Sequence, residues 1–259
     1  MNNIYAVVNQ KGGVGKTTTA INLAAGLGIL GQKVLLVDMD PQGNATTGLG
    51  IDKSKLEGCV YNVIVDGIPI SKIAVKTEEK NLYLVPATLD LAGADIELMS
   101  KMSRETRLKL ALKQVEEEYD VIIIDCPPSL GLLTVNVLTA AQFTILPIQC
   151  EYYALEGITQ LLQTINLVSQ NLNPNLKIGK ILMTMFDYRT SLSEAIVEEV
   201  KNFFKEKCAA VIVPRNVKLS EAPSHGKSIF TYDPNSKGAE NYGAFAVEVL
   251  EFGKTQNDK

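Results

Sequence analysis

The sequence predicts an α/β fold, a doubly wound, mostly parallel sheet with helices on both faces. Strand-like and helix-like segments alternate along most of the chain. The strand-like segments are continuous apolar runs, as a parallel sheet covered on both faces requires, and they lack the alternation of a half-exposed sheet. We therefore expect right-handed crossovers and a single domain over residues 1–259.

The first half of the chain opens with a strand at 4–9, followed by a glycine-rich loop and a helix with apolar residues at helical spacing. Gly31 is placed to end that helix. Further strands are expected at 33–38, 81–87 and 120–125, and an amphipathic helix is expected at 104–119.

The second half continues the alternation and closes on a helix. We expect strands at 143–149, 178–186 and 209–214, helices at 155–172 and 191–207, an irregular stretch to about Lys237, and a last helix at 240–252.

The composition is that of a soluble globular protein, with 46% hydrophobic and 21% charged residues. No run of about 18 apolar residues predicts a membrane span. The N-terminus has no basic leader, so we expect no signal peptide and a cytoplasmic protein. The four cysteines lie far apart, which argues against zinc and favours reduced, buried thiols. His225, the one histidine, lies in a turn-like context, so a histidine-based catalytic triad is not expected.

The glycine-rich loop reads NQKGGVGKTTT over 9–19. It fits the phosphate-binding pattern G-x-x-x-x-G-K-[ST] except that Gln10 replaces the first glycine. Lys16 is expected to reach the β- and γ-phosphates, and the Thr17 hydroxyl to hold Mg²⁺. A glycine-rich turn without function is the alternative, but the strand before and the helix after favour a nucleotide site. The loop residues expected to bind ATP are Gly12, Gly13, Val14, Gly15, Lys16, Thr17 and Thr18.

Aspartates follow two of the expected strands. Asp38 and Asp40 lie in VDMDPQGN, and Asp125 ends the Walker B-like segment VIIID. The carboxyl ends of parallel strands meet at one edge of the sheet, so these carboxylates should face the loop. There they can hold Mg²⁺ and its water shell or orient an attacking water. An ordinary turn after Asp40 is the alternative.

These residues indicate a Mg²⁺-dependent nucleoside triphosphatase, and K-G-G-V-G-K-T, D-M-D-P-Q-G-N and D-C-P-P-S together resemble the deviant Walker A ATPases of the MinD/ParA superfamily. Within them, VIVPRNVKLSEAPSHGKSI and YDPNSKGAENY are similar to segments of the ParA/Soj partition ATPases. The resemblance covers nearly the whole chain. It implies an ATPase that dimerises around two ATP molecules and, as a dimer, binds double-stranded DNA of any sequence. A ParB-type partner and a role in chromosome or plasmid segregation are implied as well.

The resemblance also assigns roles in the nucleotide site. It implies that Lys11 crosses to the phosphates of the partner protomer, and Gly12 leaves room for that approach. Asp40 would position the attacking water, so Lys11, Lys16 and Asp40 are the expected catalytic residues. The expected Mg²⁺ ligands, directly or through water, are Thr17, Asp38 and Asp125.

Further roles follow for the second half of the chain. Pro214 and Asn216 match the segment that contacts adenine, and Arg189 and Lys218 match positions implicated in DNA binding. Ten Lys and Arg stand against seven Asp and Glu between 171 and 237, a net charge of +3 in a chain of net charge −4. An ordinary solvated surface is the alternative explanation for these cations.

Two other functions share the loop. A MinD-like membrane-cycling ATPase would need a basic amphipathic C-terminal helix, whereas the tail AFAVEVLEFGKTQNDK carries two glutamates in its apolar part. An iron–sulfur electron-transfer ATPase would need cysteines presented to a partner, and Cys126 and Cys150 lack a matching sequence context. We therefore expect no membrane partner and no iron–sulfur cluster.

Overall fold

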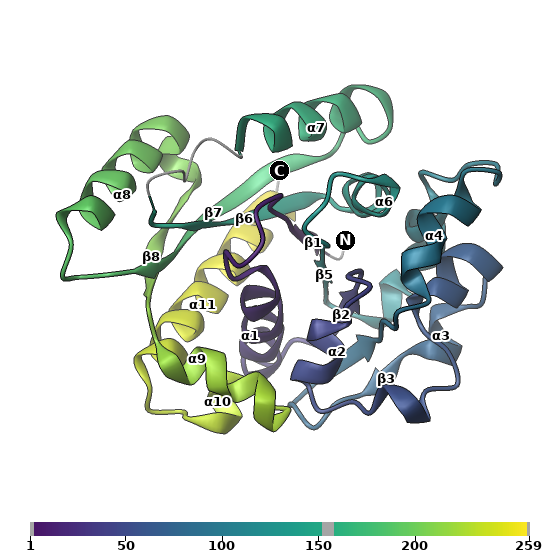
Figure 1. The fold of residues 1–259 in the computed structure, drawn as a ribbon, viewed down its shortest axis with the longest axis horizontal. Coiled ribbons are helices and arrows are strands. Elements are labelled where there is room, and N and C mark those ends of the chain that lie inside the picture. Colours follow the sequence, from purple (N-terminus) through teal and green to yellow (C-terminus); the bar gives the residue numbers. More distant parts are fainter. Residues whose placement is uncertain (1–2, 152–157, 258–259) are drawn as a thin grey trace.

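An eight-stranded sheet with the order β3-β4-β2-β5-β1-β6-β7-β8 forms the centre of the molecule (Figure 1). The computed structural model describes residues 3–151 and 158–257. All neighbouring strands pair in parallel except β3 with β4. The strands are β1 (Asn3–Val7), β2 (Val34–Asp38), β3 (Val75–Lys76), β4 (Leu82–Val85), β5 (Val121–Asp125), β6 (Phe143–Gln149), β7 (Lys177–Phe186) and β8 (Cys208–Pro214).

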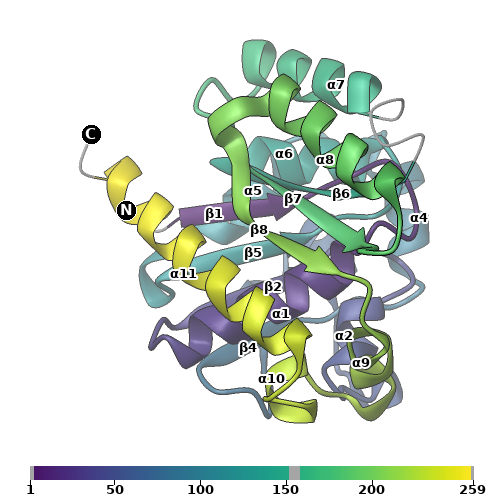
Figure 2. The same ribbon diagram turned by 90° about the vertical axis from the view of Figure 1, so that its left-hand side faces the viewer.

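Helices cover both faces of this sheet (Figure 2). One face carries α1, α10 and α11, and the other carries α5 to α8. This arrangement confirms the predicted doubly wound, mostly parallel α/β fold, in which β3 pairs antiparallel with β4 at one edge. The longer helices are α1 (Lys16–Ile29), α4 (Leu91–Leu98), α5 (Arg107–Lys113), α6 (Leu132–Ala140), α7 (Ile158–Asn171), α8 (Ser191–Phe204) and α11 (Lys237–Asn257). Within the described ranges, no helix has the length and apolar character that crossing a membrane requires.

Each central strand contributes side chains to two separate cores, one on each face of the sheet. In β1, Ile4 and Ala6 belong to the core under α5 to α8, whereas Tyr5 and Val7 belong to the core under α1 and α11. All residues of β2 and β5 are buried. Burial on both faces explains why these strands read as uninterrupted apolar runs.

The predicted helix at 104–119 is wrong in extent. The helix α5 covers only Arg107–Lys113, and a 3₁₀ turn at Glu116–Glu118 follows it. Tertiary contacts decide this outcome, because the Asn136 side chain donates to the Arg104 carbonyl at 2.8 Å and holds that residue outside the helix. The Arg107 guanidinium donates to the Ile64 carbonyl at 2.8 Å and fixes the start of the helix.

The expected irregular stretch before Lys237 is also wrong, because it contains short helices. These are α9 (Val217–Glu221), a 3₁₀ turn (Ala222–His225) and α10 (Ile229–Tyr232), and α11 then begins at Lys237. Distant side chains anchor the stretch: Ile229 N donates to the Asn22 side chain and Ser228 N donates to the Glu79 carboxylate, both at 2.8 Å.

Several elements fall outside the sequence-based predictions. The helices α2 (Asn44–Gly48), α3 (Ile70–Ile73), α4 and α6 and the short strand β3 were not predicted. The first residues of the helix predicted at 155–172 lie outside the described residues, and its remainder is found as α7.

Gly28→Ala is expected to lower the free energy of unfolding by about 1–3 kcal/mol. A Cβ at Gly28 would collide with the backbone carbonyl oxygen of Lys80. That backbone is held in turn by Asn81, whose side chain donates to the Gly28 carbonyl at 3.2 Å. Gly93→Ala in α4 is the control, because its Cβ would meet only the flexible end of Glu97. Denaturant unfolding should show a loss for the first variant only, and equal stabilities would contradict the close approach.

Candidate functional site

The glycine-rich loop connects the carboxyl end of β1 to the first turn of α1. Gly13 and Gly15 have positive φ angles of 75° and 89°, which favour glycine, and Gly15 is the N-cap of α1. The Val14 side chain is buried, so only its backbone can face a ligand, and its carbonyl accepts a hydrogen bond from Thr184 Oγ1 at 2.9 Å. Thr184, on β7, therefore anchors the loop, a role that the sequence did not reveal.

The loop borders a cleft of about 520 Å³, called the phosphate cleft below. Lys16 is 7% exposed and its Nζ donates to the Lys11 carbonyl at 3.1 Å, so its ammonium group spans the loop. Burial lowers the pKa of Lys16, and the nearby Asp125 carboxylate opposes that shift. The predicted residues that line the phosphate cleft are Gly12, Gly13, Gly15, Lys16, Thr17, Thr18 and Asp40.

Asp38 and Asp125 are register partners at the ends of the neighbouring strands β2 and β5. Both are fully buried. The Asp38 carboxylate is already occupied, because it accepts hydrogen bonds from Thr46 N at 2.8 Å, Thr46 Oγ1 at 2.7 Å and Asp40 N at 3.2 Å. Within the described part of the chain no hydrogen bond to either oxygen of Asp125 is found, although the Thr17 side chain lies near enough to oppose the rise in its pKa. Asp125 is therefore the carboxylate with oxygens available for a cation.

A hard divalent cation fits this arrangement. A buried carboxylate next to the Thr17 hydroxyl is the kind of oxygen donor set that Mg²⁺ takes from a protein when phosphates and water complete its shell. The described residues contain no group of three His, Cys, Asp or Glu side chains that could hold a metal ion. The chain would thus supply few ligands itself. Asp38 would act on the cation through the residues it orients.

Asp40 follows Asp38 by two residues and lines the phosphate cleft. Its side chain is 7% exposed, and Oδ1 accepts a hydrogen bond from Gln42 N at 2.9 Å. This bond holds the carboxylate in a turn at the edge of the cleft. Such a group can orient a water or take its proton.

Asp125→Asn should stabilise the metal-free protein more at pH 8 than at pH 5. Burial, and then the charge of Asp38, raise the pKa of Asp125 well above its ordinary value, and burial raises that of Asp38 to about 6. A carboxyl group whose pKa is higher in the folded than in the unfolded state stabilises the fold while it is protonated. This stabilisation is complete below pH ~4 and is lost as the pH rises through the folded-state pKa. Urea unfolding in the presence of a chelator measures the free energy of unfolding of both proteins. The advantage of the variant over wild type should grow by roughly 1–3 kcal/mol between pH 5 and pH 8. A difference independent of pH would contradict the shift.

A second cavity, of about 340 Å³, adjoins the loop and is called the base pocket below. Pro214 and Asn216, the residues predicted to contact adenine, line it together with Gly15 and Thr18. Asn216 Oδ1 accepts a hydrogen bond from Lys218 N at 2.9 Å, which caps α9 and leaves the side-chain amide N–H groups for a ligand. Met185 and Tyr242 also line the base pocket, and no motif indicated them.

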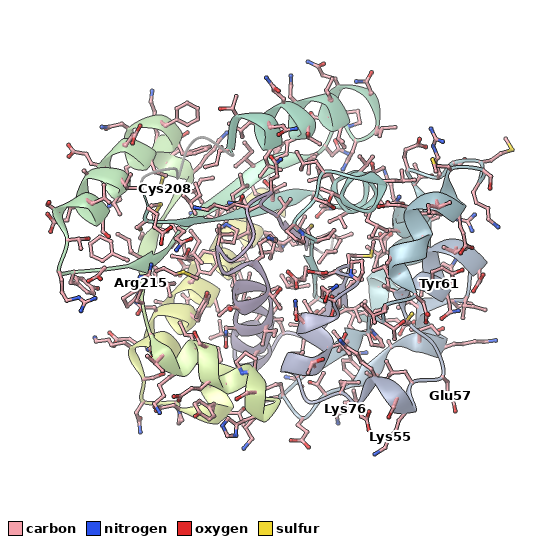
Figure 3. All side chains as sticks on the ribbon, in the orientation of Figure 1. Lys55, Glu57, Tyr61, Lys76, Cys208 and Arg215 are labelled. Carbon is pink, nitrogen blue, oxygen red and sulfur yellow. The ribbon has the colours of Figure 1, made fainter. Side chains whose placement is uncertain are left out.

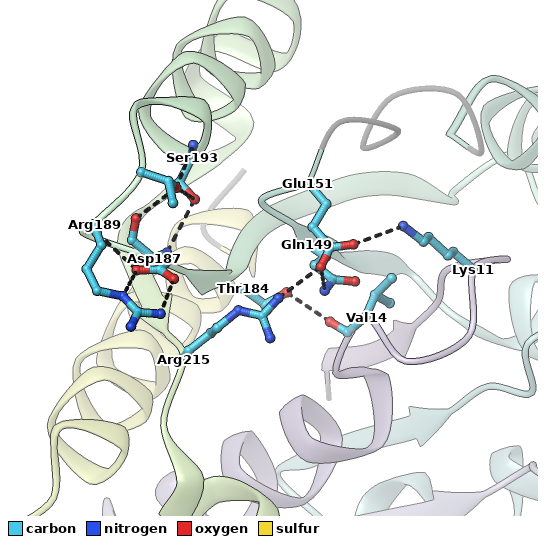
Figure 4. Close-up of polar contacts among 10 residues, drawn as sticks. Lys11, Val14, Gln149, Glu151, Thr184, Asp187, Arg189, Ser193 and Arg215 are labelled. Atoms are coloured by element: carbon cyan, nitrogen blue, oxygen red, sulfur yellow. Dashed lines mark hydrogen bonds and ion pairs between the residues drawn. The ribbon is translucent and has the colours of Figure 1, made fainter.

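Lys11 points away from the phosphate cleft of its own chain. Its Nζ lies 3.7 Å from Glu151 Oε2, and the side chain is 40% exposed (Figure 4). Glu151 Oε1 accepts a hydrogen bond from Arg215 at 2.9 Å, so one carboxylate holds both cations. The two lysines of the loop therefore differ in placement, since Lys16 is buried across the loop and Lys11 is turned outward.

Comparison with known proteins places this site in a family. Residues 2–178 match a family described as "AAA domain". The sporulation initiation inhibitor protein Soj of Bacillus subtilis is 56% identical over 253 residues, which are 98% of this chain and 100% of that protein. This chain belongs to the Soj/ParA family. The motif-based prediction of the family is thereby confirmed.

A second relative and a solved structure are also similar to this Soj/ParA chain. The chromosome partitioning protein ParA of Myxococcus xanthus is 55% identical over 248 residues, covering 96% of this chain and 88% of that protein. The crystal structure of cobyrinic acid a,c-diamide synthase from Mycobacterium smegmatis with bound ATP analog and magnesium has a TM-score of 0.87 and 41% identity. That similarity covers 99% of this chain and 97% of the other.

The rival functions of the Soj/ParA chain find no support in the packing. The apolar side of α11 is buried against α1 and the sheet through Tyr242, Phe245 and Val249, so it is not a free membrane-binding face. Cys126 and Cys150 are buried, and burial raises the pKa of both thiols. Buried thiols of this kind are poor ligands for a cluster shared with a partner.

Proposed function

We propose that this Soj/ParA chain is a Mg²⁺-dependent ATPase whose ATP-bound homodimer holds double-stranded DNA of any sequence. In this proposal a ParB-type partner triggers hydrolysis and release during chromosome or plasmid segregation. The observation that supports the proposal is the placement of Lys11, which pairs with Glu151, so that the described lining of the phosphate cleft holds Lys16 but not the second loop cation. A second copy of the chain can supply that cation.

The loop residues bind the triphosphate. Backbone N–H groups from Gly12 to Thr17 and the N-terminus of α1 offer donors to the phosphate oxygens, and Lys16 adds a buried positive charge. Thr17 and Asp125 would hold Mg²⁺, which neutralises charge on the β- and γ-phosphates when it is bound. Asp40 orients the attacking water for in-line displacement.

Lys11 completes the site from the partner protomer. A lysine supplied in trans stabilises the charge that develops on the γ-phosphate, as an arginine finger does in other nucleotide hydrolases. ADP lacks the group that Lys11 would contact, so ATP holds the dimer together and hydrolysis loosens it. The base pocket receives adenine next to Pro214 and Asn216.

DNA binding in this proposal is a property of the dimer. Arg189 and Lys218 are exposed cations on the same side of the base pocket. Pairing two chains doubles the phosphates contacted, and salt-dependent DNA binding steepens with that number. The protein would be cytoplasmic and associated with the nucleoid in its ATP-bound form.

DNA retention under three nucleotide conditions tests the proposal. A fluorescent duplex of arbitrary sequence is immobilised and washed with protein in ATP, ADP or no nucleotide, each with Mg²⁺. We expect retention with ATP alone, and release when a ParB-type protein is added. Retention that is equal in all three conditions, or absent in all of them, would overturn the proposed ATP-dependent switch.

Arg189→Glu is expected to weaken retention of DNA by the ATP-bound dimer about tenfold, because it exchanges a phosphate-attracting charge for a repelling one. ATP-dependent dimerisation should be unchanged, because Arg189 lines neither the phosphate cleft nor the base pocket. Lys55→Glu is the matched control, a charge reversal at a side chain that is similarly exposed. Unchanged retention by the Arg189 variant would remove this residue from the DNA-binding surface.

A further inference from the structure

Four cations surround one surface hollow next to the base pocket. The hollow has a volume of about 650 Å³ and extends from the end of β7 to the start of α11. We call it the cation hollow, and its basic residues are Arg189, Arg215, Lys218 and Lys237. Only two of them, Arg189 and Lys218, were indicated by the sequence motifs.

Each of these four cations is paired with a carboxylate of the same chain. The N–O distances are 2.7 Å for Arg189 and Asp187, 2.9 Å for Arg215 and Glu151, 3.0 Å for Lys218 and Glu221, and 2.7 Å for Lys237 and Glu240. Each cation is thus partly neutralised, although Asp187 is the one carboxylate among the described residues that line the hollow and Glu151 is shared with Lys11. The free chain therefore presents the cation hollow with less positive charge than its four basic side chains alone would give.

The pair of Asp187 and Arg189 is the most constrained (Figure 4). Two parallel hydrogen bonds join them, from Nε to Oδ1 at 2.9 Å and from Nη2 to Oδ2 at 2.7 Å. The backbone N–H of Arg189 also donates to Oδ1, at 3.0 Å. One edge of the guanidinium, formed by Nε and Nη2, is thus occupied by a carboxylate, which partly neutralises the charge that a phosphate would meet. These hydrogen bonds hold the pKa of Asp187 far below its usual range, so this carboxylate stays ionised.

We infer that the carboxylates around the cation hollow act as in-chain competitors of DNA phosphate, and that they set the threshold that makes DNA binding depend on the dimer. The inference rests on the proposed function and names its regulation. A phosphate that approaches Arg189 through Nη1 meets the negative charge of Asp187 beside it, and it must displace that carboxylate to gain the edge formed by Nε and Nη2. Glu221 and Glu240 place the same opposing charge beside Lys218 and Lys237.

The threshold follows from the number of phosphates bound. The number of phosphate contacts sets the exponent with which the DNA-binding constant depends on salt concentration, so a few partly neutralised cations bind weakly at physiological salt. A dimer carries two cation hollows, so it contacts twice as many phosphates and the exponent of the salt dependence doubles. The two hollows together then bind DNA where one alone does not. Exposed ion pairs such as these are weak individually, so DNA can displace them when several contacts form at once.

The test removes two competing charges and leaves the cations in place. The variant is Asp187→Asn with Glu240→Gln, which keeps side-chain size and one acceptor oxygen and removes the negative charge. Glu151 is left unchanged because it also contacts Lys11. The matched control is Asp52→Asn with Glu105→Gln, which removes two carboxylates from ion pairs with Lys55 and Arg104 that do not line the cation hollow. Lys55 lies on the opposite flank of the molecule from Arg215 (Figure 3).

Fluorescence anisotropy with a duplex of arbitrary sequence is measured across a salt series, with ATP and without nucleotide. We expect the hollow variant without nucleotide to bind several-fold more tightly than wild type, roughly three- to tenfold. The slope of log K against log salt should steepen by about 0.9 for each phosphate gained. The control variant should match wild type.

Equal gains in both variants would attribute the effect to net charge and overturn the inference. Weaker binding by the hollow variant would also overturn it, because Asp187 would then position Arg189 and not compete for it. Wild-type protein reports separately on the proposed function. If wild type fails to bind DNA with ATP, the proposed function is contradicted. If wild type binds DNA only with ATP and the hollow variant binds DNA no more tightly than wild type, this inference alone is contradicted.

Discussion

Lys11→Ala should bind ATP as tightly as wild type and yet remain monomeric with ATP and Mg²⁺. The Lys11 side chain does not line the phosphate cleft of its own chain, so its removal leaves Lys16, Thr17 and the loop backbone intact. In the dimer each Lys11 would make a charge-assisted hydrogen bond to phosphate, worth roughly 1.5–3 kcal/mol. A symmetric dimer loses two of these, so we expect dimerisation to weaken by at least about 100-fold.

Sedimentation velocity with a non-hydrolysable ATP analogue measures this change, and nucleotide titration of the same sample measures binding. Lys109→Ala is the control, because that lysine is exposed on α5 and lines neither the phosphate cleft nor the base pocket. A Lys11 variant that dimerises like wild type would refute the role in trans. Loss of ATP binding would show that Lys11 acts within its own chain.

Asp40→Ala is expected to slow hydrolysis by a factor of about 10²–10⁴, the range of a positioned acid–base group. Asp40 lines the phosphate cleft and forms no ion pair with any residue in the described ranges, so its removal should spare nucleotide binding. The ATP-bound dimer should then persist, and DNA should stay bound after ATP is withdrawn. Single-turnover phosphate release and a timed wash from DNA measure the two effects.

Asp40→Asn separates the chemical role of Asp40 from its structural one. The amide oxygen can still accept the hydrogen bond from Gln42 N, so the turn is kept while the proton-accepting charge is lost. We expect the Asn variant to hydrolyse ATP as slowly as the Ala variant. Turnover near the wild-type rate in either variant would remove Asp40 from the catalytic step.

The central strands could be predicted from the sequence because their signal is local. β6 has the predicted bounds, 143–149, and β5 differs by one residue, because both are apolar runs buried on both faces. The short elements carried no such signal. The helix α10 has four residues, and its first residue, Ile229, donates its backbone N–H to the side chain of Asn22. These two residues are 207 positions apart in the sequence. No window along the chain contains that contact.

The site likewise contains residues that the sequence motifs indicated and contacts that they did not. The loop and the three aspartates are sequence motifs, and the structure gathers them at the carboxyl ends of β1, β2 and β5. The contact from Thr184 to Val14 spans 170 positions, and the carboxylate shared by Lys11 and Arg215 joins three distant segments. These partners are set by the topology of the sheet, so residue order alone did not reveal them.

The four residues Pro214 to Val217 line the base pocket on one side and the cation hollow on the other. A small molecule that occupies the base pocket would therefore contact the same short segment that shapes the surface proposed to bind DNA. Inhibitor screening can use this: loss of a DNA-anchored fluorescent signal would report occupancy of the base pocket without any measurement of phosphate release.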